Sequence, residues 1–313
     1  MAELRIVFMG SPGFALPALN KLVEAGHQLV GVVTQPDKKR GRGGALIPTP
    51  VKARAQELGI HPILQPEKLK DEDFIRSLKS LEADLYVVVA FRILPEAVFM
   101  MPPLGSINIH PSLLPKYRGA APLNWAIING DKETGVSIMK ISREIDAGGL
   151  LAQQRVEIAA NETVGELHDR LAALGAEMLI DVIEQVREGT IKPIPQNDEA
   201  ATPAPKITKE MCHLNFAQPA DSVKNWIHGL SPFPAAHAEY QGKKVKIYRA
   251  EVESLQVIED RPGTVLEANG YRLIVACQPG SLRITELQLE GKRRLTAAEF
   301  LRGVKISPGE QFQ

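Results

Sequence analysis

Cysteine, net charge and long apolar runs are scarce or absent in this sequence. The two cysteines among 313 residues, Cys212 and Cys277, are too few for a disulfide framework and cannot alone hold a zinc ion. The 37 basic and 37 acidic residues cancel, so no overall field attracts the chain to nucleic acid or to a membrane. No apolar run reaches the ~18 residues of a membrane span, and the N-terminus lacks a secretory signal. We therefore expect a cytoplasmic protein with free thiols and no bound metal.

The length of the chain predicts two domains rather than one. A chain of 313 residues exceeds what a single hydrophobic core usually supports. Residues 190–205 are rich in proline and in small or polar side chains, without a helical or strand period, as is typical of a linker. We therefore predict a first domain at 1–189 and a second at 206–313. Nothing in the sequence suggests a coiled coil or a swapped strand, so we expect a monomer.

The first domain begins with the pattern of a doubly wound, Rossmann-like α/β fold. A branched apolar run at 4–9 predicts a strand, residues 10–13 a glycine turn, and 15–25 a helix. The continuous apolar run at 84–90 is typical of a central parallel strand that is buried on both faces. The opening turn lacks a full G-x-G-x-x-G, and no acidic residue ends the second strand at 28–34. Both absences argue against a dinucleotide site.

The second domain has the pattern of a small β-barrel of the OB-like kind. Short segments separated by turns predict five strands, at 236–240, 244–253, 263–268, 271–276 and 281–289. This part of the chain holds 15 Lys and Arg against 12 Asp and Glu, so we expect the barrel to carry the basic face. Each of its lysine clusters could equally be a solvated turn.

The most informative stretch is residues 106–122, a short strand that runs into a long polar loop. Alternate side chains of a strand share a face, so Asn108 and His110 point one way, while Ile107 and Ile109 point to the core. The end of a strand is where α/β proteins place their sites. An amide donor beside an imidazole suits a reaction in which a carbonyl oxygen gains charge while a proton moves. The alternative is a histidine satisfied near a core and an asparagine that caps a turn.

A carboxylate is predicted to join this pair. The segment 133–141 has a strand pattern and SREIDAGG follows it, so we expect Asp146 at the same edge of the sheet as His110. The glycines Gly148 and Gly149 allow the backbone to approach a ligand closely. An aspartate before two glycines is, on its own, more often a turn residue.

The N-x-H-P-S-L-L-P segment at 108–115 and the later D-x-G segment at 146–148 resemble the hallmark of the folate-dependent formyltransferases. The resemblance runs over nearly the whole chain. It implies that 10-formyltetrahydrofolate, a substrate rather than a permanently bound cofactor, donates its formyl group to an amine. Asn108 and His110 would stabilise the oxyanion of the tetrahedral intermediate. Asp146 would orient His110 and help to move the proton, and no metal is implied.

The same resemblance implies a folate site. The residues that it points to are Ser112, Leu113, Leu114, Pro115, Arg92 and Leu94. Arg92 departs from the glycine that is more frequent in the tRNA-modifying members, and glycinamide ribonucleotide transformylases carry an arginine in a similar stretch. Arg92 could instead be a surface cation that pairs with an acidic neighbour.

The second domain selects the acceptor within that family. It resembles the tRNA-contacting domain of the tRNA-modifying members, which the glycinamide ribonucleotide enzymes lack. The implied acceptor is the α-amine of initiator methionyl-tRNA, used in translation initiation. Arg42 in the basic, glycine-rich loop 35–52 would contact the tRNA, as would Lys206 and Lys209, and Phe14 would line a methionyl pocket. The loop could also be a mobile solvated loop, and Phe14 a core residue at a helix start.

Two other functions stay open on the sequence. A transferase acting on a small amine such as a nucleotide sugar, or a formyl-folate hydrolase, would share the first domain, although neither needs a basic loop. An RNA-binding protein that had lost catalysis would not need a catalytic trio, yet Asn108, His110 and Asp146 are all present. A tRNA acceptor predicts binding that depends steeply on salt, and a sugar acceptor predicts almost no dependence.

Overall fold

The computed structural model describes residues 3–40 and 44–313. Its contacts divide the chain into two compact units, and the second unit takes in two internal segments as well as the C-terminal part. The first unit comprises 1–119, 135–156 and 168–203, and the second comprises 120–134, 157–167 and 204–313. The division into domains at 1–189 and 206–313 follows composition along the chain and stays a prediction.

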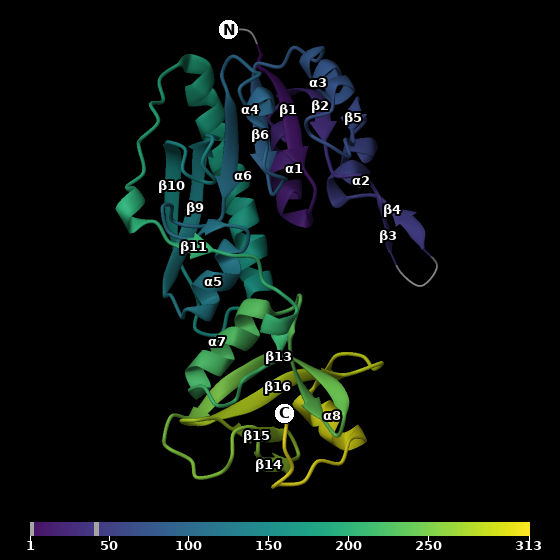
Figure 1. Cartoon of the computed structure of the whole chain (residues 1–313), viewed down its shortest axis with the longest axis vertical. Helices are drawn as coiled ribbons and strands as arrows, with labels where there is room; N and C mark the ends of the chain where they lie inside the picture. Colours follow the sequence, from purple (N-terminus) through teal and green to yellow (C-terminus); the bar gives the residue numbers. More distant parts are fainter. Residues whose placement is uncertain (1–2, 41–43) are drawn as a thin grey trace. The chain divides into compact units, whose positions relative to one another are not determined.

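A seven-stranded sheet carries the first unit, and it confirms the predicted Rossmann-like α/β class (Figure 1). Its strand order is β10-β9-β7-β6-β1-β2-β5. The strands are β1 (Arg5–Gly10), β2 (Gln28–Val33), β5 (Ile63–Leu64), β6 (Leu85–Val89), β7 (Ser106–His110), β9 (Glu133–Lys140) and β10 (Leu150–Glu157). Strands β1, β2, β5, β6 and β7 pair in parallel, whereas β9 runs antiparallel to β7. Every residue of β6 is buried, as its apolar run predicts.

Helices pack on this sheet and hold β7 in place. They are α1 (Leu16–Glu24) after the 3-10 turn η1 (Gly13–Ala15), α2 (Pro50–Glu57), α3 (Glu72–Lys79), α4 (Glu96–Phe99) and α6 (Val164–Glu188). The short α4 was not among the predicted elements. The Asp71 carboxylate caps α3 by accepting two backbone N–H bonds, which satisfies donors that a helix start leaves free. Gly175 brings α6 close behind β7, since a Cβ there would lie 2.7 Å from the Ile109 Cγ2 methyl.

The basic segment 35–52 is more regular than predicted. It contains an antiparallel hairpin, β3 (Lys38–Arg40) with β4 (Ala45–Ile47), where the sequence predicted a basic loop. At its base the Asp37 carboxylate accepts from Lys52 Nζ at 2.6 Å and from Gln65 Nε2 at 2.7 Å. These bonds lower the pKa of the Asp37 carboxyl. Gly44, the residue directly before β4, has a φ of 61°, a conformation that favours glycine.

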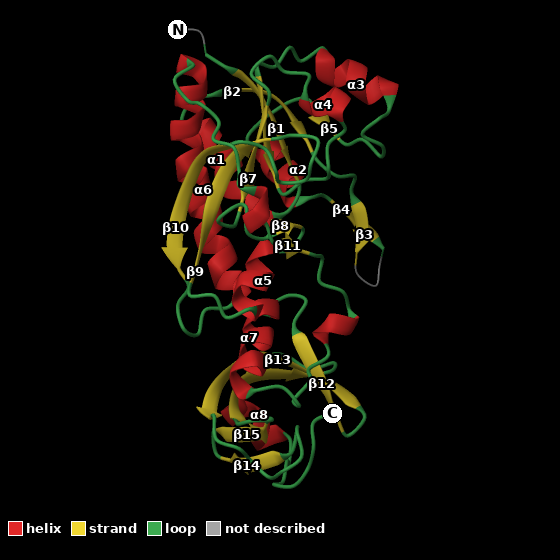
Figure 2. Cartoon of the chain, turned by 60° about the vertical axis from the view of Figure 1, so that its left-hand side comes forward, coloured by secondary structure: helices red, strands yellow, loops and turns green. Residues whose placement is uncertain are grey.

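An antiparallel sheet of six strands carries the second unit (Figure 2). The strands are β12 (Ala236–Tyr240), β13 (Lys243–Ser254), β14 (Val265–Asn269), β15 (Arg272–Ala276), β16 (Ser281–Leu289) and β17 (Leu295–Thr296). The five predicted strands are confirmed; β17 was not predicted. The chain's last residues bond to both edge strands, at Glu239 of β12 and at Val265 of β14. They close the gap between these edges, as a barrel requires.

Helices α5 (Pro122–Ile128), α7 (Ala220–Leu230) and α8 (Ala297–Gly303) complete the second unit, with a 3-10 turn at η3 (Glu210–Cys212). A capping box that joins Thr296 and Glu299 starts α8, a signal present in the sequence but not used in the prediction. Helices α5 and α7 pack together, and Asn124 donates to the Gly229 carbonyl between them. Across the described part of the chain, no helix is long and apolar enough to cross a membrane.

His228 on α7 makes the stability of the second unit depend on pH. It is 2% exposed, and its Nε2 accepts the Ala250 N–H at 3.3 Å. Burial is the main cause that lowers the pKa of His228 to about 4, and the nearby Lys224 and Arg249 charges add to it. The unfolded chain therefore binds a proton between pH 6.5 and 4 that the folded chain does not bind. Stability is fully present above pH 6.5 and falls as the pH drops towards 4.

We expect the native protein to lose about 2 kcal/mol of unfolding free energy through His228 between pH 7.5 and pH 5. His228→Gln keeps an acceptor for the Ala250 N–H but does not titrate. Between the same two pH values the unfolding free energy of the variant should therefore fall by that amount less than the unfolding free energy of the native protein. Both tryptophans, Trp125 and Trp226, belong to this unit, so urea unfolding followed by tryptophan fluorescence measures it. Equal pH dependence in the two proteins would contradict the prediction.

Candidate active site

The end of β7 presents the predicted pair of side chains. Asn108 is half-buried and His110 is 4% exposed, whereas Ile107 and Ile109 are buried in the core. Ile109 lies against α6, so the opposite face of the strand is free to carry the polar pair. The structure therefore confirms the predicted alternation of polar and apolar side chains along β7.

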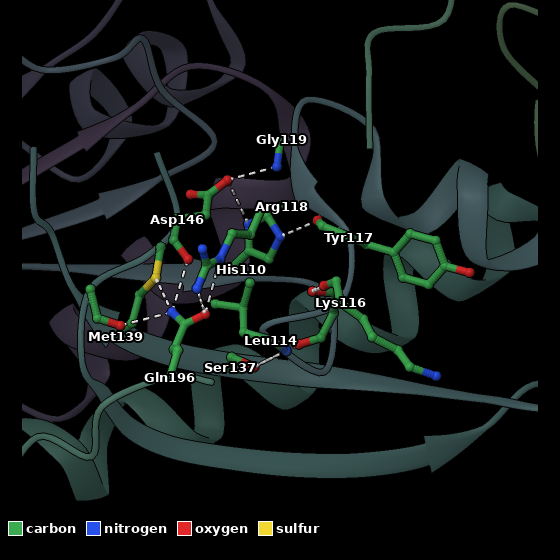
Figure 3. A network of polar contacts seen from close by, with 12 residues as sticks. His110, Leu114, Lys116, Tyr117, Arg118, Gly119, Ser137, Met139, Asp146 and Gln196 are labelled. Carbon is green, nitrogen blue, oxygen red and sulfur yellow. Dashed lines mark hydrogen bonds and ion pairs between the residues drawn. The ribbon is translucent and has the colours of Figure 1, made fainter. Parts of the chain in front are cut away.

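Both ring nitrogens of His110 face polar groups (Figure 3). Nε2 lies 2.9 Å from the Tyr117 carbonyl oxygen. Because a carbonyl only accepts, Nε2 carries the proton of that bond. Nδ1 lies 3.7 Å from Asp146 Oδ2. That distance is too long for a direct hydrogen bond, so Nδ1 is the ring atom with room for a substrate oxygen or a water.

Asp146 reaches His110 by a route that differs from the predicted one. The expectation that Asp146 leaves its strand at the same sheet edge as His110 is wrong, because β9 is antiparallel to β7. Lys140, the last residue of β9, pairs with Ile107 near the start of β7. Residues 141–149 then fold back along the sheet to bring the carboxylate to the imidazole. Asp146 itself has a φ of 52°, and its Oδ2 accepts the Gly119 N–H at 2.9 Å.

Glycine is required where this returning loop passes its own strand. A Cβ on Gly148 would lie 1.7 Å from the Lys140 carbonyl oxygen, and a Cβ on Gly149 would lie 2.7 Å from Pro193 Cβ. The sequence predicted that these glycines allow a close approach. The structure shows that Gly148 approaches the protein's own backbone and that Gly149 approaches the Pro193 side chain.

The loop that follows His110 is held by buried hydroxyl groups. Ser112 is fully buried, and its Oγ donates to the Lys116 carbonyl at 2.7 Å. Ser137 Oγ donates to the Ser112 carbonyl at 2.6 Å and accepts the Leu114 N–H at 3.1 Å. Gln153 Nε2 donates to the Leu114 carbonyl at 3.0 Å. These bonds fix the course of the loop beside His110.

The side chains predicted to bind folate differ in exposure. Within the loop, Leu114 is 3% exposed, and Leu113 and Pro115 are half-buried. Leu94 is 7% exposed and lies in the core with Val98 and Phe99.

Arg92 is bound to the backbone. Its guanidinium donates to the carbonyls of Pro66 and Glu67, at 2.7 and 3.0 Å, and lies over the Phe91 ring. Burial lowers the pKa of Arg92. The sequence left open that Arg92 pairs with an acidic side chain. In the structure its guanidinium bonds to backbone carbonyls instead.

The residues predicted to bind the acceptor are spread over both units. Phe14 in η1 is 5% exposed and lies edge-on to the His168 ring, with 5.1 Å between centroids. Lys206 and Lys209 are exposed in the second unit. Arg42 lies outside the described residues.

Sequence reasoning missed several residues that support the site. Tyr117 and Gly119 bond to His110 and Asp146 through their backbone, whereas Ser137 and Gln196 bond to the surrounding loops through their side chains. Gln196 lies in the segment predicted as a linker. A lone glutamine between prolines carries no local signal, since its partners are 48 to 78 residues away.

The site combines an amide donor, an imidazole and a carboxylate at the end of a strand. Such a group can stabilise negative charge on a carbonyl oxygen and move a proton between two nitrogens. The arrangement is of a kind that suits acyl transfer.

Comparison with known proteins gives the family. Residues 4–183 match the family described as formyl transferase, and residues 206–305 match the formyl transferase C-terminal domain. A methionyl-tRNA formyltransferase of Bacteroides thetaiotaomicron is 46% identical over 98% of this chain and 98% of its own length.

Two solved structures share the fold at low identity. HypX from Aquifex aeolicus in complex with tetrahydrofolic acid is 22% identical with a TM-score of 0.67, over 98% of this chain and 49% of that one. WlaRD, a sugar 3N-formyl transferase, is 18% identical with a TM-score of 0.67, over 94% of this chain and 100% of that one.

Gly148→Ala tests the close approach of the returning loop. The new methyl group overlaps the Lys140 carbonyl, so we expect the loop to shift, Asp146 to move from His110 and stability to fall by about 1–3 kcal/mol. Gly13→Ala is the control, because a Cβ there meets no atom within 4 Å. A crystal structure and thermal unfolding of both variants provide the measurement. An unmoved Asp146 with native stability would show that the loop tolerates the methyl group.

Proposed function

Because this chain belongs to the methionyl-tRNA formyltransferases, we propose that its Asn108–His110–Asp146 site carries the transfer of a formyl group from 10-formyltetrahydrofolate. The acceptor is the α-amine of initiator methionyl-tRNA, and the product serves translation initiation in the cytoplasm. The single observation that supports this site most strongly is the closeness of His110 and Asp146, 36 positions apart, beside the 112–115 loop.

The proposed reaction is direct attack without a covalent enzyme intermediate. The amine nitrogen bonds to the formyl carbon, the bond from that carbon to N10 of the folate breaks, and a proton passes from the amine to N10. Asn108 and His110 donate to the oxygen that becomes negative, and one well-placed donor of this kind contributes about 3–4 kcal/mol. Nδ1 is the His110 atom for this task, since Nε2 donates to the Tyr117 carbonyl. Because both ring nitrogens then act as donors, the form of His110 that stabilises this oxygen is the imidazolium. Asp146, with its Oδ2 3.7 Å from Nδ1, orients the ring and takes part in proton movement through a water.

The proposed folate site is the 112–115 loop together with the turn after β6. Leu113 and Pro115 keep part of their apolar surface exposed for a planar ring. Arg92 would act by fixing the turn, because its guanidinium is already bonded to two carbonyls. Leu94 would support the same turn from the core.

The proposed tRNA contacts are Arg42, Lys206 and Lys209, with Phe14 near the methionyl group. Many arginines of the second unit are paired with carboxylates, as Arg272 is with Glu253 and Glu267. Lys206 and Lys209 are exposed, which leaves their ammonium groups available to phosphate. We accordingly propose a catalytic role for 1–189 and tRNA binding for 206–313, in a monomeric enzyme.

His110→Ala should lower kcat for formyl transfer by about 10²-fold or more, since it removes both a donor to the oxyanion and the partner of Asp146. The fold should survive, because β7 is held by Ile107 and Ile109. His61→Ala, at an exposed histidine of the same unit, is the control and should keep native turnover. Initial rates with saturating substrates, alongside circular dichroism, give the comparison. A folded His110→Ala protein with native turnover would remove His110 from the mechanism.

Salt dependence separates a tRNA acceptor from a small amine. For tRNA we expect log Kd to rise steeply with log salt, by about 0.7–0.9 per phosphate contact. Replacing Lys206 and Lys209 by Ala should reduce that slope by about 1–2, whereas Lys79→Ala on α3 should not change it. Filter binding of initiator tRNA from low to moderate salt gives the slopes. A flat salt response would instead favour a small amine such as a nucleotide sugar; WlaRD, which shares the fold, is a sugar 3N-formyl transferase.

A further inference from the structure

Gln196 bonds to both of the loops that surround His110. Its Nε2 donates to the Asp146 carbonyl at 2.9 Å and to the Gly148 carbonyl at 2.8 Å. Its Oε1 accepts from Arg118, at 3.1 Å from Nε and 2.8 Å from Nη2. Figure 3 shows the Gln196 amide in the middle of this network, with Asp146 and Arg118 on its two functional atoms. The side chain is thus fully engaged as donor and acceptor.

Each of the two loops controls one of the reacting side chains. Arg118, the first residue of the short strand β8 (Arg118–Gly119), lies between Tyr117, which accepts from His110, and Gly119, which donates to Asp146. The second loop carries Asp146 itself. The Gln196 amide, by joining Arg118 to the Asp146 backbone, therefore fixes the distance between the His110 imidazole and the Asp146 carboxylate.

The chain around Gln196 strengthens this bridge. Asp198, in the 3-10 turn η2 (Asp198–Ala200), accepts from Arg118 Nη2 at 2.6 Å. Thr202 Oγ1 accepts the Tyr117 N–H at 2.9 Å, and the Thr202 carbonyl accepts the Arg118 N–H at 2.9 Å. Tyr117 has a φ of 61°, a conformation that a non-glycine residue holds only when its surroundings impose it. Residues 196–202 supply that restraint.

We propose that Gln196 is a positioning residue, which sets the geometry of His110 and Asp146 for the transfer step without contacting substrate. This inference rests on the proposed function of the site. It also gives the segment predicted as a linker a second task, since its residues 196–202 belong to the framework of the active site.

An amide meets both requirements at this position. Two carbonyl oxygens need a donor, and a guanidinium needs an acceptor. A glutamate would keep the acceptor for Arg118 but would place a carboxylate oxygen against the carbonyls of Asp146 and Gly148. Gln196→Glu therefore breaks the link to the Asp146 loop while it preserves the link to the His110 loop.

The test compares Gln196→Glu with Gln185→Glu, the same change at an exposed position of α6. For Gln196→Glu we expect kcat to fall by about 10–100-fold while KM for the folate and for methionyl-tRNA changes less than about threefold. Gln185→Glu should match the native protein. In a His110→Ala background Gln196→Glu should cause little further loss, because a positioning residue acts through the group that it positions.

A second readout does not depend on the acceptor. In the native protein the His110 Nε2 proton, bonded to Tyr117, should exchange slowly with water, and its NMR signal is assigned by its loss in His110→Ala. Gln196→Glu should speed that exchange; Gln185→Glu should not. A folded Gln196→Glu protein with native kcat and native exchange overturns the inference. If the native protein transfers no formyl group, the proposed function fails, and the exchange measurement alone decides whether Gln196 positions His110.

Discussion

The hydrogen bond from His110 Nε2–H to the Tyr117 carbonyl is the interaction on which the site depends. It closes the loop after β7 back onto the end of that strand and at the same time fixes which ring nitrogen is available. Two residues after Tyr117, the Gly119 N–H donates to Asp146 Oδ2. A single stretch of backbone, 117–119, thus bonds to both His110 and Asp146. The position of each of these side chains therefore depends on this stretch.

The geometry of the sheet explains why this arrangement needs so much support. A strand parallel to β7 would have delivered Asp146 directly, but β9 runs the other way, and a loop of residues 141–149 has to return the carboxylate. Residues 141–149 form no strand, and they bond to strand residues at their two ends, Ile141 to Ser106 and Gly149 to Lys140. The position of this loop is also secured by the close approach at Gly148 and by the Gln196 amide. The reactive pair therefore depends on contacts from residues 117–119, from Gln196 and from the end of β9 at Lys140.

The features that the sequence predicted correctly are those with a short period or a local pattern. The alternation of Asn108 and His110 with two isoleucines follows from the two-residue period of a strand, and the buried run of β6 follows from its continuous apolar composition. The N-x-H and D-x-G segments selected the family. The direction of β9 could not be predicted, because parallel and antiparallel strands buried on both faces have similar sequences. Gln196 was missed because all of its partners are distant in the chain.

The most direct test of the account is an acceptor comparison with the purified native protein. Formyl transfer from 10-formyltetrahydrofolate would be measured with methionyl-initiator tRNA, uncharged initiator tRNA and an amino-sugar nucleotide. The account predicts rapid transfer to methionyl-initiator tRNA and none to the other two. Transfer to the amino-sugar nucleotide alone would contradict the assigned acceptor but not the proposed catalytic site. Folate binding without transfer to any of the three would contradict the proposed role of Asn108, His110 and Asp146.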